Sequence, residues 1–132
     1  MRSALWPHAA RTHPGEIDAF LAGAREDAET FVAEAGDPAA EAVGFAEVRV
    51  RGHAEGCRSP RVAYLEGWWV APARRRSGVG AALLRAVEAW ARARGLTELA
   101  SDAELANPVG QAAHEALGFA EVERQVCYRK PL

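Results

Sequence analysis

The spacing of apolar residues changes along the chain and predicts a series of strands and helices. Residues 61–71 are apolar at both alternating sets of positions, as expected for a strand in the middle of a covered sheet, and Gly67 inside this run indicates a bulge or a close backbone approach. Residues 78–94 instead place Leu83, Val87 and Trp90 on one face of a helix. We also expect strands at residues 29–35, 42–50, 96–101 and 119–129, and a short amphipathic helix at 16–25.

A further helix is predicted to begin at Asn107, because asparagine is a favourable N-cap and Pro108 suits the first helical position. Gly118 is expected to close this helix. Four apolar residues are expected to form its buried face: Val109, Ala113, Ala116 and Leu117.

The order of these elements indicates an α/β domain with a mixed sheet, since strands come first and a strand–helix–strand–helix–strand series follows. The helix over 78–94 is expected to connect two parallel strands by a right-handed crossover. The 132 residues of the chain suffice for one hydrophobic core and are too few for two, so we expect a single domain over residues 1–132.

Composition and charge argue against several classes of function. The net charge of −2 gives no case for nucleic acid or an anionic membrane as partner. No apolar run approaches the roughly 20 residues that span a bilayer, and the first residues are too short and too broken a run for a secretory signal. Cys57 and Cys127 lack the spacing of metal ligands, so we expect free thiols, no metal and a reducing, cytoplasmic setting.

A basic, glycine-rich loop follows the strand at 61–71 and leads into the next helix, with the sequence Arg75-Arg76-Ser77-Gly78-Val79-Gly80. The unpaired N–H groups and the dipole of a helix N-terminus attract anions, and glycines let phosphate oxygens approach the backbone. The spacing fits neither the Walker loop nor the dinucleotide fingerprint. From these residues alone, a solvated basic turn remains an alternative to a phosphate site.

Two motifs in this order resemble the GNAT superfamily of N-acetyltransferases. Arg-x-x-Gly-x-Gly after Val70-Ala71-Pro72 resembles its acetyl-CoA pyrophosphate loop, and a helix opened by Asn107 and ending in Ala116-Leu117-Gly118-Phe119 resembles its second motif. The resemblance implies acetyl-CoA as cosubstrate and a mixed sheet whose central parallel strands splay apart, with the thioester carbonyl against a backbone N–H near Val70. The residues that it assigns to acetyl-CoA are Trp69, Val70, Arg75, Arg76, Ser77, Gly78, Val79, Gly80, Ala81 and Asn107.

Further segments resemble aminoglycoside 6′-N-acetyltransferases: Leu5-Trp6-Pro7, Leu65-Glu66-Gly67, Ala100-Ser101-Asp102, His114 to Phe119 and Glu121-Val122-Glu123-Arg124. This resemblance implies antibiotic resistance through direct transfer of an acetyl group to the 6′-amine of an aminoglycoside. It also implies a homodimer. It assigns the cationic substrate to Glu66 and Asp102, and an aromatic wall of the substrate pocket to Trp6.

The residue types agree with a cationic substrate. Glu66 is a carboxylate within an apolar strand, where an unpaired charge is costly, and Asp102 follows the next parallel strand, where open sheets gather ligand sites. Either is a candidate base for the substrate amine, directly or through water. The alternatives are a salt bridge from Glu66 to a neighbouring arginine, a plain turn aspartate at 102, and core packing for Trp6.

Two histidines stand where the family often has tyrosine. His114 replaces the general acid of many members, and an imidazole can protonate the departing thiolate near neutral pH. Its helical position lies off the expected buried face, so a plain surface histidine is the alternative. His53 replaces a tyrosine of the substrate pocket, and we expect the substrate range to differ there.

The chain also departs from the family at its start. The family has a strand and most of a helix ahead of the Leu-Trp-Pro segment, whereas Met1 stands only four residues before Leu5. Either the true start lies upstream or the first strand is missing. Two other functions stay open at this point: an N-acetyltransferase for a polyamine or an amino acid, and a non-catalytic CoA-binding module.

Overall fold

The computed structural model describes residues 27–36 and 41–132. Trp6, the predicted helix at 16–25 and most of the turn at 36–38 lie outside these residues. The described elements are β1 (Ala28–Ala35), β2 (Glu41–Arg51), β3 (Val62–Val70), the 3₁₀ turn η2 (Pro72–Arg74), α3 (Val79–Ala93), β4 (Leu99–Ser101) and α4 (Pro108–Ala116). Apart from η2, which was not predicted, each lies at or within two or three residues of the element predicted there.

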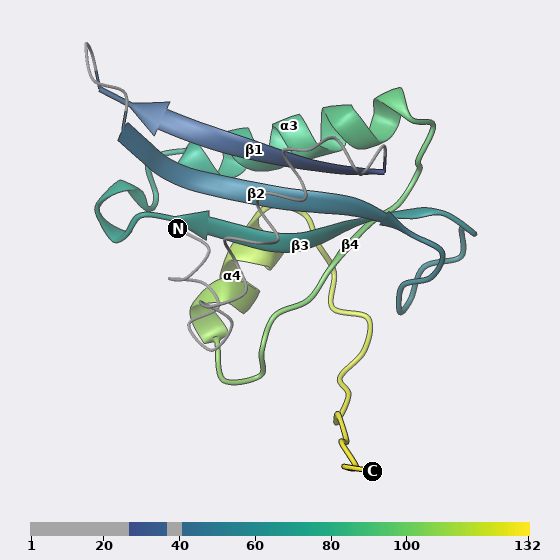
Figure 1. The fold of residues 1–132 in the computed structure, drawn as a ribbon. Helices are drawn as coiled ribbons and strands as arrows, with labels where there is room; N and C mark the ends of the chain where they lie inside the picture. Colours follow the sequence, from purple (N-terminus) through teal and green to yellow (C-terminus); the bar gives the residue numbers. More distant parts are fainter. Residues whose placement is uncertain (1–26, 37–40) are drawn as a thin grey trace.

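The four strands form one sheet in the order β1-β2-β3-β4 (Figure 1). β1 and β2 are antiparallel, as are β2 and β3, whereas β3 and β4 are parallel and connected through α3. The mixed α/β sheet predicted from the order of elements is therefore confirmed. The parallel pairing covers only three residues of β3, from Ala63 to Leu65, so the remaining part of β3 has no partner on that side among the described strands.

A β-bulge interrupts β3 next to Gly67. Glu47 of β2 pairs with Gly67 and Val48 pairs with Leu65, which leaves Glu66 as the extra residue. The bulge predicted from Gly67 is thus confirmed, but the predicted faces of the strand are wrong beyond it. Strict alternation groups Trp68 and Val70 with Tyr64, whereas the structure packs both with Ala63 and Leu65 in the main core. One extra residue in a period-two strand moves every later side chain to the other face.

The main core lies between α3 and the sheet. Leu83, Leu84, Val87 and Trp90 of α3 are buried against Val48 and Leu65 of the strands. This is the helical face predicted from the sequence. α3 ends as expected near Gly95, whose φ of 72° is left-handed. Figure 1 shows α3 lying along the sheet over β1 and β2. The shorter α4 lies beside β3, on the side away from β2.

The C-terminal part of the chain differs from the prediction in two ways. Val109 is 69% exposed and Ala116 is also exposed, so only Ala113 and Leu117 of the expected buried face of α4 are partly covered. Residues 119–129 form no strand. Their alternating pattern suits a strand, but a strand requires a hydrogen-bonded neighbour, and this segment runs away from the sheet (Figure 1).

Candidate active site

The Arg/Gly loop, residues 75–81, carries the N-terminus of α3. Gly78 is the N-cap residue with a left-handed φ of 89°, no side chain caps the helix, and the first turn holds no acidic residue. A Cβ at Gly78 would meet no atom within 4 Å. By contrast, the side chain of Asn107 caps α4 by accepting a hydrogen bond from the N–H of Gly110 at 2.9 Å. The first N–H groups of α3 are therefore the ones open to an anion.

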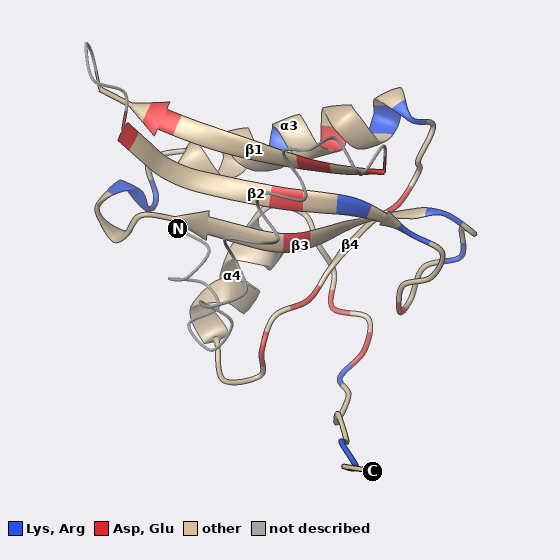
Figure 2. Ribbon diagram, viewed as in Figure 1, with Lys and Arg blue, Asp and Glu red and all other residues tan. Residues whose placement is uncertain are grey.

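Basic side chains surround this helix start. Arg75 and Arg76 are exposed, and Figure 2 shows the basic segment between β3 and α3. Arg76 has a left-handed φ of 59°, while the Ser77 hydroxyl donates to the carbonyl of Arg74 and closes the turn. The loop thus joins open backbone donors to positive charge, and the residues present fit the pyrophosphate of a CoA.

Gly80 serves a different purpose from Gly78. A Cβ at Gly80 would lie 2.9 Å from Cζ2 of Trp68, closer than non-bonded atoms approach. The second glycine of the motif therefore lets α3 pack directly against the indole of β3. The Nε1 of Trp68 is buried and has no hydrogen-bond partner within residues 27–36 and 41–132.

The end of β3 directs one backbone N–H away from β2, toward the side on which β4 pairs only with Ala63 to Leu65. The N–H of Ala71 donates to the carbonyl of Val43 in β2 at 2.8 Å. Because successive N–H groups of a strand point in opposite directions, that of Val70 points toward the opposite edge. The Val70 carbonyl, on this same edge, accepts a hydrogen bond from Nε of Arg75 at 3.1 Å. The side chain of Trp69 packs at a tilt on Phe45, with ring centroids 6.3 Å apart.

The two predicted substrate carboxylates belong to one connected group of side chains, which we call the Tyr64 cluster: Arg51, Tyr64, Glu66 and Asp102. The Tyr64 hydroxyl donates to Oδ1 of Asp102 at 2.7 Å. The Arg51 guanidinium lies 3.5 Å from the centre of the Tyr64 ring and donates to both oxygens of Glu66, at 2.8 and 2.6 Å. Asp102, one residue beyond β4, is exposed, as expected of a residue at a strand end.

Within the Tyr64 cluster, Glu66 is the carboxylate that is paired with arginine. The Glu66 side chain is 25% exposed and faces Arg51 at 2.6 Å, with Nε of Arg49 at 3.8 Å, so the arginine salt bridge considered from the sequence is present. Hydrogen bonding to Glu66 raises the pKa of Arg51 further above its usual value. Burial, and then the bond to Asp102, raise the pKa of Tyr64, so its hydroxyl stays protonated at neutral pH.

The His114 side chain is hydrogen-bonded through both ring nitrogens and packs against two aromatic rings. Its Nδ1 lies 2.7 Å from the Gly110 carbonyl and its Nε2 lies 2.8 Å from Oγ of Ser101. The ring also makes edge contacts with Trp68 and Phe119, at centroid distances of 5.4 and 5.1 Å. Because a carbonyl only accepts, Nδ1 carries a proton. The single proton of the Ser101 hydroxyl is directed either to Nε2 of the neutral ring or to the Leu65 carbonyl, which lies 3.3 Å from Oγ. His114 is therefore half-buried and bonded, rather than a plain surface histidine.

The remaining predicted residues lie apart from these contacts. His53 is exposed in the loop between β2 and β3, and Trp6 lies outside the described residues. Sequence reasoning missed Arg51, Tyr64 and Ser101 as members of the site. A signal existed for Tyr64, because it precedes Glu66 by two positions on the same strand.

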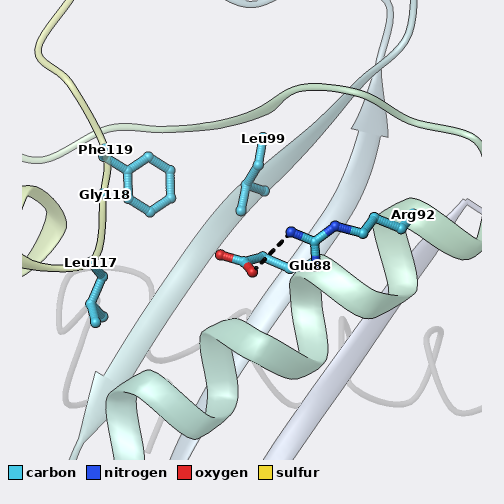
Figure 3. Close-up of a pocket in the computed structure, with 6 residues that line it drawn as sticks. All are labelled: Glu88, Arg92, Leu99, Leu117, Gly118 and Phe119. Carbon is cyan, nitrogen blue, oxygen red and sulfur yellow. Dashed lines mark hydrogen bonds and ion pairs between the residues drawn. The ribbon is translucent and has the colours of Figure 1, made fainter.

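A shallow cleft lies outside this site (Figure 3). It is lined by Glu88, Arg92, Leu99, Leu117, Gly118 and Phe119. Glu88 and Arg92 form an ion pair at 3.3 Å along α3. None of the residues predicted from the sequence to bind substrate or acetyl-CoA lines this cleft.

The described residues contain no helix long and apolar enough to cross a membrane. Within the same part of the chain, no three side chains of the metal-binding types gather into a group that could hold an ion.

A helix start without a side-chain cap follows a strand that parts from its parallel neighbour, as the resemblance to the GNAT superfamily implies, and the family comparison agrees. Residues 2–119 match the Acetyltransferase (GNAT) family, and the chain belongs to it. Over its whole length the chain is 50% identical to aminoglycoside N(6′)-acetyltransferase type 1 of Klebsiella aerogenes, covering 87% of that protein. It is 47% identical to the protein of the same name from Stenotrophomonas maltophilia, covering 84% of it.

Solved structures give the same result. AAC(6′)-Iy in complex with the bisubstrate analogue CoA-S-monomethyl-acetylneamine superposes with a TM-score of 0.88 at 36% identity, over 100% of this chain and 88% of that one. The aminoglycoside 6′-N-acetyltransferase of Acinetobacter haemolyticus also superposes with a TM-score of 0.88 at 36% identity, over 99% of this chain and 88% of that one.

Proposed function

We propose that this protein transfers the acetyl group of acetyl-CoA to the 6′-amino group of aminoglycoside antibiotics and thereby confers resistance to them. The observation that carries the proposal is similarity over the whole chain to proteins named for this activity. The uncapped, positively flanked N-terminus of α3 supports acetyl-CoA as the donor. This function is favoured over a polyamine or amino acid acetyltransferase and over a non-catalytic module, because the relatives share one activity.

For the site we propose that the pyrophosphate of acetyl-CoA binds the backbone of residues 76–81. The thioester then lies along the open edge of β3, where the N–H of Val70 donates to the carbonyl oxygen. The acidic residues Glu66 and Asp102 attract the polycationic substrate, and Trp6 and His53 contribute to its pocket. The link through Tyr64 and Arg51 supports one shared pocket for both carboxylates.

The reaction runs as a direct displacement in a ternary complex. The 6′-ammonium group first loses a proton to Asp102 or Glu66, directly or through water, and the free amine attacks the thioester carbon. The Val70 N–H stabilises the developing oxyanion. Collapse of the tetrahedral intermediate expels the CoA thiolate, and the amine nitrogen gives up its second proton to solvent to leave the neutral amide. The imidazolium form of His114 donates its Nε2 proton to the oxygen of Ser101, whose hydroxyl proton passes to the thiolate.

Matched substrates test the proposal. Purified protein is assayed for CoA release with acetyl-CoA and two aminoglycosides, one with a 6′-amine and one with a 6′-hydroxyl in its place. We expect turnover and a mass increase of one acetyl group on the first only. Equal turnover on both would contradict the 6′ position, and activity confined to polyamines or amino acids would contradict the substrate class.

We also propose a cytoplasmic homodimer. The C-terminal arm, residues 119–132, supports the assembly: it leaves the body as an extended segment and exposes Val122, Val126 and Tyr128. β4 is the last strand in the sheet order, so the described sheet ends in an edge with open backbone groups. A second copy supplies both a strand partner for the arm and a cover for that edge. A cytoplasmic setting agrees with the supply of acetyl-CoA there and with free Cys57 and Cys127.

A further inference from the structure

Asp102 is the carboxylate of the Tyr64 cluster that has no ion-pair partner among the described residues. Both oxygens of Glu66 accept hydrogen bonds from Arg51, which offsets the charge of Glu66. Asp102 forms no salt bridge with any residue of ranges 27–36 and 41–132, and one of its oxygens is bonded to a neutral hydroxyl. A substrate ammonium group is therefore attracted more strongly to Asp102 than to Glu66.

The hydroxyl that donates to Asp102 belongs to Tyr64, a buried residue of the paired part of β3. Tyr64 is 5% exposed and lies in the three-residue stretch where β3 pairs with β4. Its ring packs with Ala54 and Val62 on one face of the sheet, and the Arg51 guanidinium covers it at 3.5 Å. Asp102, in contrast, is exposed and begins the turn after β4. The exposed Asp102 carboxylate is thus hydrogen-bonded to the hydroxyl of a buried, closely packed tyrosine.

A tyrosine suits this task better than a lysine or an arginine. A cationic partner would hold the carboxylate and also cancel the charge that attracts an ammonium group. The neutral hydroxyl fixes one oxygen of Asp102 and leaves the other to accept from a ligand. A hydrogen bond to a charged group is also stronger than one between neutral groups.

We propose that Tyr64 is a positioning residue of the acetyltransferase reaction, acting through Asp102 on the cationic aminoglycoside. This inference rests on the proposed function. Tyr64 does not touch the reacting atoms; it holds the Asp102 carboxylate in the orientation that binds the substrate ammonium group. Arg51 contributes by packing on the ring, while its bonds to Glu66 keep the guanidinium from pairing with Asp102.

A double-mutant cycle tests the proposal. Tyr64→Phe retains the ring and removes only the hydroxyl. We expect it to raise the aminoglycoside KM about tenfold, as loss of a hydrogen bond to a charged group implies, with the acetyl-CoA KM unchanged. Asp102→Asn is expected to raise the aminoglycoside KM at least as much. Because Tyr64 acts through Asp102, the double variant should be no worse than Asp102→Asn alone.

The chain offers a matched control, since Tyr128 is its only other tyrosine and is 92% exposed. Tyr128→Phe is expected to leave both KM values at the wild-type level. An unchanged aminoglycoside KM in a folded Tyr64→Phe protein would overturn the proposal, and so would a further tenfold loss in the Asp102→Asn background. Wild-type turnover on the 6′-amine is measured separately, so failure here leaves the proposed activity standing.

A second measurement covers the case in which Tyr64→Phe does not fold. In the Tyr128→Phe background, biosynthetic 3-fluorotyrosine labels Tyr64 alone. We expect its ¹⁹F resonance to shift on addition of an aminoglycoside to the full-length protein, and this shift to be lost in the Asp102→Asn variant. A ¹⁹F chemical shift that does not change on addition of the aminoglycoside would contradict the proposed coupling between Tyr64 and the substrate through Asp102.

Discussion

Glu66 illustrates how one residue serves the structure and the site together. It is the extra residue of the bulge in β3, and its carboxylate is bound by Arg51 on the neighbouring strand. A charge in an apolar strand requires such a partner. Its removal therefore disturbs the position of Arg51 as well as the acidity of the pocket.

We predict that Glu66→Gln lowers the free energy of unfolding by about 1 kcal/mol, a figure already discounted for the partial exposure of the ion pair. The aminoglycoside KM should rise several-fold, since Arg51 is released to compete for Asp102, while the affinity for acetyl-CoA stays constant. Thermal unfolding and steady-state kinetics measure both effects. A weakened acetyl-CoA affinity instead would argue that Glu66 belongs to the cofactor side.

His114 is predicted to assist catalysis without being indispensable. A thiol with a reference pKa of about 8.5 is a stable leaving group near neutral pH, so a general acid has little to add. Both ring nitrogens are also bonded to the protein, at 2.7 and 2.8 Å, so any proton reaches the thiolate through Ser101. We expect His114→Ala to lower kcat about tenfold or less with little change in either KM.

Ser101→Ala is the companion variant for His114. It is expected to lower kcat to the same degree, because the hydroxyl lies between the imidazole and the Leu65 carbonyl of β3 and carries the proposed proton transfer. Complete loss of activity in a folded His114→Ala protein would contradict the modest role. An active Ser101→Ala enzyme with wild-type kcat would contradict the relay.

At the scale of the element, the two glycines at the start of α3 should respond differently to substitution. We predict that Gly78→Val weakens acetyl-CoA binding at least tenfold, about 1.4 kcal/mol, because valine strains the left-handed N-cap and crowds the open N–H groups. Gly80→Val should chiefly lower stability, by about 2 kcal/mol, because its side chain would overlap the Trp68 ring. Calorimetric titration with acetyl-CoA and thermal unfolding separate the two effects. Equal acetyl-CoA affinity in a folded Gly78→Val protein would contradict the phosphate site.

The loop before β3 is fastened to the start of β4 by one carboxylate. Glu98 accepts hydrogen bonds from the N–H of Arg58 and from the N–H and hydroxyl of Ser59. The bonds from Ser59, and then that from Arg58, lower the pKa of Glu98 from its ordinary value of 4.5. A carboxyl with a lowered folded pKa contributes stability above its unfolded pKa and loses that contribution as the pH falls.

We therefore predict that Glu98→Gln lowers the melting temperature at pH 7, and that the difference from the wild type shrinks as the pH falls below the ordinary value of 4.5. Melting curves of both proteins between pH 7 and pH 3 measure this. A difference that stays constant over the range would show that Glu98 acts by shape and not by charge.

The two described α-helices, α3 and α4, and the first four predicted strands could be predicted from the sequence because each depends on local pattern, such as the Leu83, Val87 and Trp90 face of α3. The sequence did not predict which side chains of β3 share a face, because the position of a bulge is set by pairing with β2 and not by the strand alone. The link from Asp102 to Tyr64 was missed for the same reason. This hydrogen bond depends on the register of the parallel strands β3 and β4, and its two residues are 38 positions apart in sequence.

At the scale of the whole molecule, the C-terminal arm carries the clearest prediction. Its alternation predicts a strand at 119–129, yet within the described part of the chain the arm has no strand partner. Apolar side chains left exposed, such as Val126 at 73% and Tyr128 at 92%, favour burial against a second copy. We expect the full-length protein to sediment as a dimer.

Substitutions in the arm test this assembly. Val126→Asp should shift the protein toward the monomer in sedimentation velocity, since it places a charge in the proposed interface. Arg85→Asp, on the exposed face of α3, is the matched surface control and should leave the dimer intact. A wild-type protein that is monomeric at micromolar concentration would contradict the proposal.

The bulge at Glu66 also bears on how this enzyme can change its substrates over evolution. Before the bulge, Tyr64 lies on the face of the sheet opposite the main core; after it, Trp68 and Val70 belong to that core and touch the helix that carries the cofactor loop. Under the proposed function, the segment before the bulge adjoins the aminoglycoside and the segment after it adjoins acetyl-CoA, so the two ligands depend on opposite faces of one strand. A substitution on the first face can therefore alter the choice of aminoglycoside without repacking the second face.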